Sequence, residues 1–308
     1  MVPMSISRPP EVAYDPSAGA GAWEEIDRTR LRLHPARVPQ PMPLPAAHEW
    51  ERIDGSPWMQ RHDVAEGCVL RLAGLADFRI DAAGVEVEAW PFPGMDADTC
   101  RHLYLNNVLP MALSRQGRLV LHASAVDIEG EAIVFVGVSG RGKSTLAAAF
   151  ARAGHALLVD DGLVLEPGAA SFMAMPGDPS VRLRRDSGDW FDAAGALPAE
   201  PLRYTDKQRL HAGDKLRFAT GPAPVRAMFL LGDDPRAPLS IQSLPPAQSM
   251  IELIHYSFLL DVGNRRRHEE SMRQAAALAS NCGVFRLDYP RDYLALGAVQ
   301  EAVASCLA

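Results

Sequence analysis

Apolar and polar residues alternate between residues 67 and 90, in the segments CVLRLAG, ADFRID and GVEVEAW. Short Gly or Ala-Gly breaks separate these segments. A period of two predicts antiparallel strands with one solvated face. The residues from 96 to 117 follow with a helical pattern, in which Asp96 or Asp98 can cap the start and Pro110 should kink or split the helix. Residues 48–117 are therefore expected to form a small α+β unit.

The pattern then changes to strands that alternate with helices, from residue 118 to the end of the chain. Residues 118–138 predict two strands around an EGE turn, and the alanine-rich run 143–154 predicts a helix that Gly154 ends. The later segments predict strands at 155–167, 225–232 and 284–290 and helices near 246–257, 265–281 and 291–306. We therefore expect an α/β domain over 118–308, with a mixed sheet flanked by helices.

Residues 1–47 differ from the rest because they are rich in proline, as in HPARVPQPMPLPAAHEW at their end. Proline fixes φ and removes a backbone donor. This stretch is expected to be an extended arm or a disordered tail.

Composition narrows the class of protein. Of the 308 residues, 47% are hydrophobic and 22% are charged. These fractions are those of an ordinary globular protein. The net charge of −7 argues against nucleic acid as a partner. The first residues contain no apolar h-region, so a secretory leader is not expected. No apolar run reaches roughly 18 residues, so no membrane partner is expected. The scattered cysteines favour a reducing compartment, so a cytoplasmic location is expected.

One short motif carries the chemistry. The segment GVSGRGKS, from Gly137 to Ser144, fits G-x-x-x-x-G-K-[ST] between a predicted strand and a predicted helix. Glycines let successive backbone N–H groups converge on phosphate oxygens, at the positive end of the helix dipole. The predicted nucleotide-binding residues are Gly137, Ser139, Gly140, Arg141, Gly142, Lys143, Ser144 and Thr145. The motif predicts a bound nucleotide, with Lys143 on the β/γ phosphates and Ser144 on Mg²⁺.

Two adjacent acids, Asp160 and Asp161, stand at the end of the strand that is predicted after this helix. One carboxylate can hold the metal, and the other can accept a proton from an attacking hydroxyl. Neighbouring strand residues face opposite sides, so both acids reach one site only if the strand ends there, with Gly162 as the flexible turn residue. Solvated acids at a strand end are the alternative interpretation.

The segment from residue 121 to residue 161 resembles the catalytic core of the HPr serine kinase/phosphorylase family. The shared features are a histidine before a strand pair, the glycine loop, a short helix, a Gly-His pair, a strand and a double aspartate. The region 48–120 is more similar to the HPr-kinase-like proteins encoded beside lasso-peptide genes, which phosphorylate a C-terminal serine of a precursor peptide. The resemblance implies a P-loop core of the HPr kinase/phosphoenolpyruvate carboxykinase type and assembly into a homo-oligomer.

By position, the resemblance implies that Asp160 is the general base, that Asp161 and Ser144 hold the metal, and that His122 lies near the transferred phosphoryl group. The family's glutamate-bearing segment after the double aspartate is not recognisable, and Glu166 is too close to replace it. In its place stands the basic segment 175–186. Its residues Arg182, Arg184 and Arg185 are candidate contacts for a nucleotide or substrate phosphate, or else solvated charges. The same holds for Lys207 and Lys215 from a second basic stretch, residues 206–218.

Three functions remain open. The first is an ATP-dependent kinase that phosphorylates a serine-type hydroxyl of a peptide or small protein, with Asp160, His122 and Lys143 as catalytic residues. The second is a regulatory module that binds ATP without productive transfer, as the missing glutamate suggests. The third is an enzyme similar to phosphoenolpyruvate carboxykinase, although the chain is short for that family. The double aspartate favours the kinase.

Overall fold

A computed structural model describes residues 23–26, 28–52, 54–169, 171–184, 207–211, 216–260 and 264–307. The described residues form two compact units. One lies within Pro9–Gly117 and Leu259–Gly263, and the other within Arg118–Phe258 and Asn264–Ala308. The chain therefore leaves the first unit after Gly117 and returns to it briefly near residue 259. We call them the N-terminal unit and the C-terminal unit.

The N-terminal unit is built on a seven-stranded sheet, in the order β1-β2-β7-β6-β5-β4-β3. The strands are β1 Trp23–Ile26, β2 Thr29–Leu33, β3 His48–Glu51, β4 Pro57–Val64, β5 Gly67–Leu72, β6 Ala76–Asp81 and β7 Glu86–Pro91. All neighbours are antiparallel except β2 and β7, which are parallel. Alternate residues such as Leu70, Phe78 and Val87 are fully buried, because one face of the sheet forms the core of this unit.

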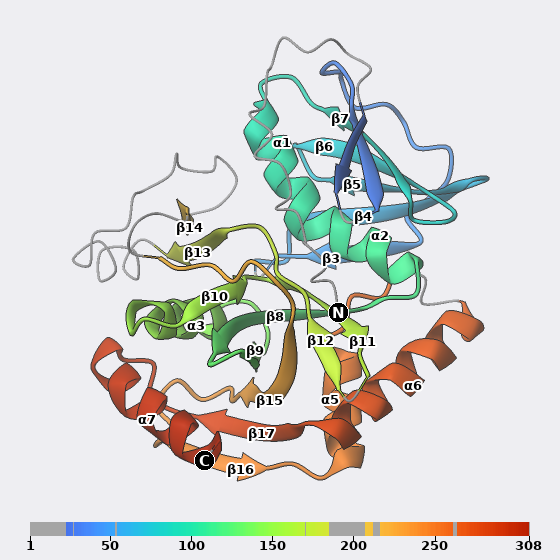
Figure 1. Cartoon of the computed structure of the whole chain (residues 1–308). Helices are drawn as coiled ribbons and strands as arrows, with labels where there is room; N and C mark the ends of the chain where they lie inside the picture. The colour runs from blue at the N-terminus through green and yellow to red at the C-terminus, as the bar shows by residue number, and fades with distance from the viewer. Residues whose placement is uncertain are drawn as a thin grey trace, which may run out of the picture. The chain divides into compact units, whose positions relative to one another are not determined.

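A segmented helix follows the sheet and packs in the same unit (Figure 1). It consists of α1 Ala97–Leu103, a π-helical turn Tyr104–Val108 and α2 Leu109–Arg115. The side chain of Asp96 accepts a hydrogen bond from the backbone N–H of Thr99 and caps α1. Pro110 lies in the first turn of α2, where its missing N–H is tolerated, so the expected split falls just before the proline.

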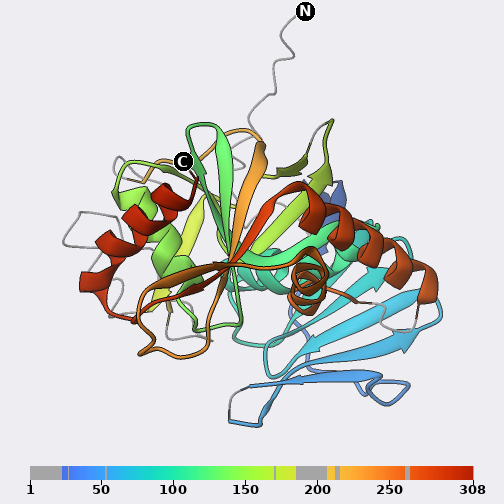
Figure 2. The same ribbon diagram turned by 90° about the horizontal axis from the view of Figure 1, so that it is seen from below.

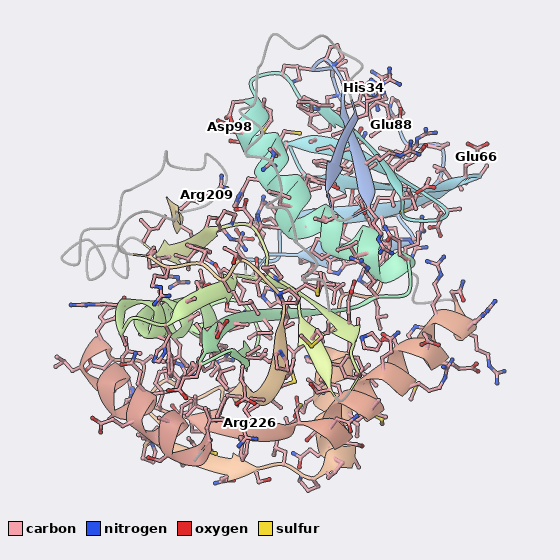
Figure 3. All side chains as sticks on the ribbon, viewed as in Figure 1. His34, Glu66, Glu88, Asp98, Arg209 and Arg226 are labelled. Atoms are coloured by element: carbon pink, nitrogen blue, oxygen red, sulfur yellow. The ribbon has the colours of Figure 1, made fainter. Side chains whose placement is uncertain are left out.

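The proline-rich stretch departs from the expected arm. Residues 29–33, which contain no proline, form β2 and pair with β7. The following segment is held to β7 by Trp90, against which His34 stacks with ring centroids 4.6 Å apart and the Arg37 guanidinium lies 4.2 Å from the ring centroid. His34 also lies 3.1 Å from Glu88, and both residues are labelled in Figure 3. The alternating segment TRLRL therefore pairs with β7 as a strand. The contacts with Trp90 hold His34 and Arg37, where the proline-rich segment begins, against the same strand. Residues 1–22 lie outside the described residues.

The C-terminal unit contains an eight-stranded mixed sheet and a separate two-stranded ribbon. The sheet strands are β8 Leu119–Ile128, β9 Glu131–Val136, β10 Ala156–Val159, β11 Gly162–Pro167, β12 Phe172–Ala174, β15 Ala223–Leu231, β16 Ser240–Ser243 and β17 Gly283–Asp288. Strand β15 pairs in parallel with β9 and with β17, so the carboxyl ends of these three strands lie at one edge. Ligands of α/β sheets bind at such an edge. The ribbon consists of β13 Ser180–Arg184 and β14 Lys207–His211.

Helices cover both faces of this sheet. They are α3 Lys143–Arg152, α5 Pro246–His255, α6 Arg265–Asn281 and α7 Leu296–Leu307, with a 3₁₀ turn Tyr293–Ala295 before α7. Phe135 and Phe229 are buried in one apolar cluster with α3 and α7, whereas Val134 and Met228 belong to a second cluster with α5 and α6. Figure 2 shows α6 and α7 on opposite sides of the strands. The unit is thus a mixed α/β domain with helices on two faces. No helix in the described part of the chain is long and apolar enough to cross a membrane.

Candidate active site

The glycine-rich loop joins β9 to α3, at the carboxyl edge of the parallel strands. Gly140 and Gly142 have left-handed φ values of +85° and +92°. Residues with side chains rarely adopt such values. Gly142 caps α3, and its carbonyl accepts the first helical hydrogen bond, at 2.8 Å from the backbone N–H of Leu146. The first N–H groups of α3 have no partner within the helix. Together with the helix dipole they make this loop suited to an anion.

Lys143 is folded back over the loop. Its side chain is buried, and Nζ donates a hydrogen bond to the carbonyl of Val138 at 3.2 Å. Burial, reinforced by the positive charges of Lys207 and Arg182, lowers the pKa of Lys143 to about 7, although Asp160 acts in the opposite direction. A phosphate in the loop would add negative charge beside this ammonium group and favour its protonated form.

The next residue of the motif, Ser144, contacts Asp160. The Ser144 hydroxyl and the Ser124 hydroxyl each donate a hydrogen bond to Oδ1 of Asp160 at 2.7 Å. Oδ2 of the same carboxylate accepts the backbone N–H of Arg182 at 2.9 Å. Asp160 is thus tied to the phosphate loop, to β8 and to the ribbon.

Asp161 has an unusual backbone conformation, with a φ of +87°. Strands β10 and β11, on either side of the two acids, both pair with β8. The predicted strand 155–167 is therefore interrupted rather than turned, and Asp161, not Gly162, adopts the left-handed conformation. This places both carboxylates beside His122 and Ser124, which alternate on one face of β8.

The Asp161 carboxylate lies between an imidazole and a guanidinium. Oδ1 is 2.7 Å from Nδ1 of His122, and Oδ2 forms an ion pair with Nη2 of Arg182. The edge of the His122 ring meets Phe258, with centroids 5.9 Å apart. Burial, together with Lys143 and Arg182, holds the pKa of His122 well below its usual value. A neutral His122 donates its Nδ1 hydrogen to Asp161 and leaves Nε2 as an acceptor.

The structure places the other predicted residues as follows. Arg182, Arg184 and Lys207 lie on the β13–β14 ribbon, where Arg184 pairs in register with Lys207. Arg141 forms an ion pair of 3.1 Å with Asp233, which follows β15 and anchors the loop. Gly137, Ser139 and Thr145 stay in the loop and the first turn of α3. Glu166 pairs instead with Arg118, at 2.7 Å. Arg185 and Lys215 fall outside the described residues.

The oxygen atoms of Ser144 and Asp160 fit Mg²⁺, which prefers oxygen ligands and retains several waters beside phosphate oxygens. Their mutual hydrogen bond brings both atoms to the same place next to the loop. The described residues contain no cluster of three or more His, Cys, Asp or Glu side chains that could hold a metal alone. The donor set therefore suits a metal that shares its coordination with a bound nucleotide.

Sequence reasoning missed two contributors to this site. Ser124, fully buried on β8, holds Asp160, and the backbone N–H of Arg182 does the same from the ribbon. A signal for Ser124 exists, because His122 and Ser124 are alternating polar residues within the otherwise apolar run from Leu119 to Val126. No local signal exists for the backbone contact, which depends on how the ribbon packs.

Comparisons with known proteins identify no family. No protein-family model matches the chain. No curated protein matches it either. Among solved structures, the HPr(Ser) kinase/phosphatase from Coxiella burnetii is similar over 60% of this chain and 94% of that chain, with 12% sequence identity and a TM-score of 0.32. A similarity of this size does not establish a shared fold or function, so the functional conclusion depends on the site itself.

Proposed function

We propose that the C-terminal unit transfers the terminal phosphoryl group of ATP to a hydroxyl group of a peptide or small protein. The observation that carries this proposal is that the two adjacent acids have different partners. Asp160 is hydrogen-bonded to Ser144 of the glycine loop, whereas Asp161 contacts His122. A nucleotide-binding loop with one acid at its metal position and a second acid beside a neutral imidazole suits a hydroxyl kinase.

These contacts support roles opposite to those that the family resemblance implies. Asp160 shares a hydrogen bond with Ser144, the other proposed metal ligand, so we assign Asp160 to Mg²⁺. Among the described residues, Asp161 has one charged or ring partner on each oxygen. Each carboxylate oxygen carries two lone pairs, so both can accept a further hydrogen. We therefore assign Asp161 as the proton acceptor for the attacking hydroxyl, with His122 as its positioning residue.

Phosphoryl transfer to the acceptor then proceeds in one displacement step. The acceptor hydroxyl gives its proton to Asp161 while its oxygen forms a bond to the γ-phosphorus. The bond from that phosphorus to the β–γ bridging oxygen breaks, and ADP leaves with the electron pair. Lys143 and the loop N–H groups stabilise the charge on the phosphate oxygens. Mg²⁺, held by Ser144 and Asp160, would supply further positive charge at the phosphates.

The test is transfer of radiolabel from γ-labelled ATP to peptides that carry serine at the C-terminus, serine in the interior, or threonine. We expect transfer by the wild-type chain. Asp161→Asn should abolish transfer, by about 100-fold or more, with Mg·ATP affinity retained, because only the proton acceptor is lost. Asp160→Asn should weaken Mg·ATP binding itself. Transfer by Asp161→Asn at the wild-type rate would remove Asp161 from this role.

A second candidate is a nucleotide-binding regulatory module without transfer. The ion pair between Arg182 and Asp161 favours it, because the guanidinium neutralises the acid that the kinase needs. This alternative predicts that purified protein binds Mg·ATP but labels none of the peptides.

A further inference from the structure

The β13–β14 ribbon has two chemically different faces. Val181, Leu183 and Leu210 are buried in the apolar cluster that also contains α3. Because strand residues alternate, Arg182 and Arg184 occupy the other face, where their cross-strand partners are Arg209 and Lys207. The ribbon is thus packed on α3 by its apolar face and presents a row of positive charges on the opposite face. Figure 3 labels Arg209 on this ribbon.

Two of the arginines in this row are already paired. Arg182 holds Asp161, and Arg209 forms an ion pair with Asp178 at 2.8 Å. Each guanidinium is therefore fixed by an acid of its own unit. A bound anion would have to share each of these guanidiniums with its acid.

Arg184 differs from both of them. Its side chain is exposed, and none of the described acidic residues forms an ion pair with it. Its Nη2 lies 3.9 Å from the position that a Cβ atom on Gly140 would occupy. A guanidinium without an acidic partner among the described residues therefore lies against a left-handed glycine of the loop that is suited to phosphate.

We propose that Arg184 binds the terminal phosphate of a nucleoside triphosphate in the loop, while Arg182 stays on Asp161 as a positioning residue. This inference rests on the proposed function. A guanidinium fork matches two phosphate oxygens, and such a cation stabilises the charge of phosphoryl transfer. The observed contacts fit this division, because Arg182 pairs with Asp161 whereas Nη2 of Arg184 lies beside Gly140.

The test compares the affinity of the full-length chain for Mg·ADP and for a non-hydrolysable Mg·ATP analogue, measured by calorimetry. In Arg184→Gln the analogue should bind about 10- to 100-fold more weakly, while ADP affinity should stay within about twofold, because only the terminal phosphate loses a charged hydrogen bond. The affinity of Arg184→Lys for the analogue should lie between that of the wild-type chain and that of Arg184→Gln. Arg226→Gln, an exposed arginine on β15, is the matched control and should change neither affinity.

Arg182 is tested by turnover. Arg182→Gln should lower kcat for transfer with both affinities retained, and Arg182→Lys should restore part of the loss. If Arg184→Gln weakens ADP and the analogue equally, or changes neither, the assignment of Arg184 is overturned while the kinase proposal stands. If the wild-type chain binds neither nucleotide, the proposed function itself is overturned, and this inference with it.

Discussion

At the scale of single residues, Lys143 is a strongly perturbed group of the site. It is buried in a place where two nearby charges, Lys207 and Arg182, are also positive, and its pKa falls to about 7. Desolvation and like charge both oppose protonation of an amine. An anion beside Lys143 would therefore remove an unfavourable interaction.

We predict that nucleotide binding takes up a proton. A bound phosphate raises the pKa of Lys143 above the value of about 7 in the free protein, so the complex holds more protons than the free components. At pH 8 the uptake should approach about one proton, and affinity should fall by up to about tenfold per pH unit above pH 7. Calorimetry in buffers of different ionisation enthalpy measures this uptake.

The control is Lys143→Arg, whose guanidinium stays protonated throughout this range and should show no uptake. The same lowered pKa has a consequence for folding. Unfolded chains bind this proton below about pH 10.4, so Lys143 makes stability rise with pH between about 7 and 10. The prediction of proton uptake would be contradicted if the binding enthalpy measured for the wild-type chain did not depend on the ionisation enthalpy of the buffer.

At the scale of elements, the glycine loop works because α3 begins at a residue with no side chain. Gly142 has a φ of +92°, and a Cβ atom there would lie 3.0 Å from Oη of Tyr289. Gly154, just after the same helix, has a similar φ of +103° but nothing within 4 Å. Both ends of α3 thus have a glycine with a left-handed φ, but an added side chain would meet another group only at Gly142.

This contrast gives a matched pair of variants. Gly142→Ala and Gly154→Ala should each destabilise the protein by about 1–2 kcal/mol, because an L-residue is strained at these φ values. Only Gly142→Ala should also weaken Mg·ATP binding, by roughly tenfold or more, since the loop must move away from Tyr289. Urea unfolding and calorimetry measure the two effects. Equal loss of nucleotide affinity in both variants would show that the effect comes from general destabilisation.

The loop and its helix were predictable from sequence because their signals are local. The apolar strand, the glycine spacing and the alanines that follow all lie in one short stretch, residues 131–154. The ribbon was not predictable, although Arg182, Arg184 and Lys207 were noted as candidates. Its register depends on apolar residues that pack on α3, and its two strands are separated by residues 185–206. The neutralisation of Asp161 by Arg182 follows from that packing, so no motif could have predicted it.

At the scale of the whole molecule, every residue assigned to the proposed reaction belongs to the C-terminal unit. His122, Lys143, Asp160, Asp161 and Arg182 all lie within Arg118–Phe258. The N-terminal unit has its own sheet and its own buried core. A ligand stabilises the part of a protein that binds it, to an extent set by its affinity and concentration.

We therefore predict that saturating Mg·ATP slows amide hydrogen exchange only in the C-terminal unit. Protection should be greatest in the loop 137–142, in the first turn of α3, at residues 160–161 and in β13, because these segments hold the proposed phosphate and metal contacts. Strands β4 to β7 of the N-terminal unit should exchange at unchanged rates. Exchange measured by mass spectrometry, with and without nucleotide, resolves these segments.

The Lys143→Met variant is the control for protection that does not come from nucleotide bound in the loop. It removes the charge that faces the phosphates, so the protection should be abolished. Protection that spread equally over β4 to β7 would mean that nucleotide binding is coupled to the N-terminal unit, and that unit would then need a role in the nucleotide cycle. Protection confined to the loop, without residues 160–161 or β13, would support the binding module over the kinase. In that case the nucleotide would be held by the loop alone, and neither the two acids nor the ribbon would take part in phosphoryl transfer.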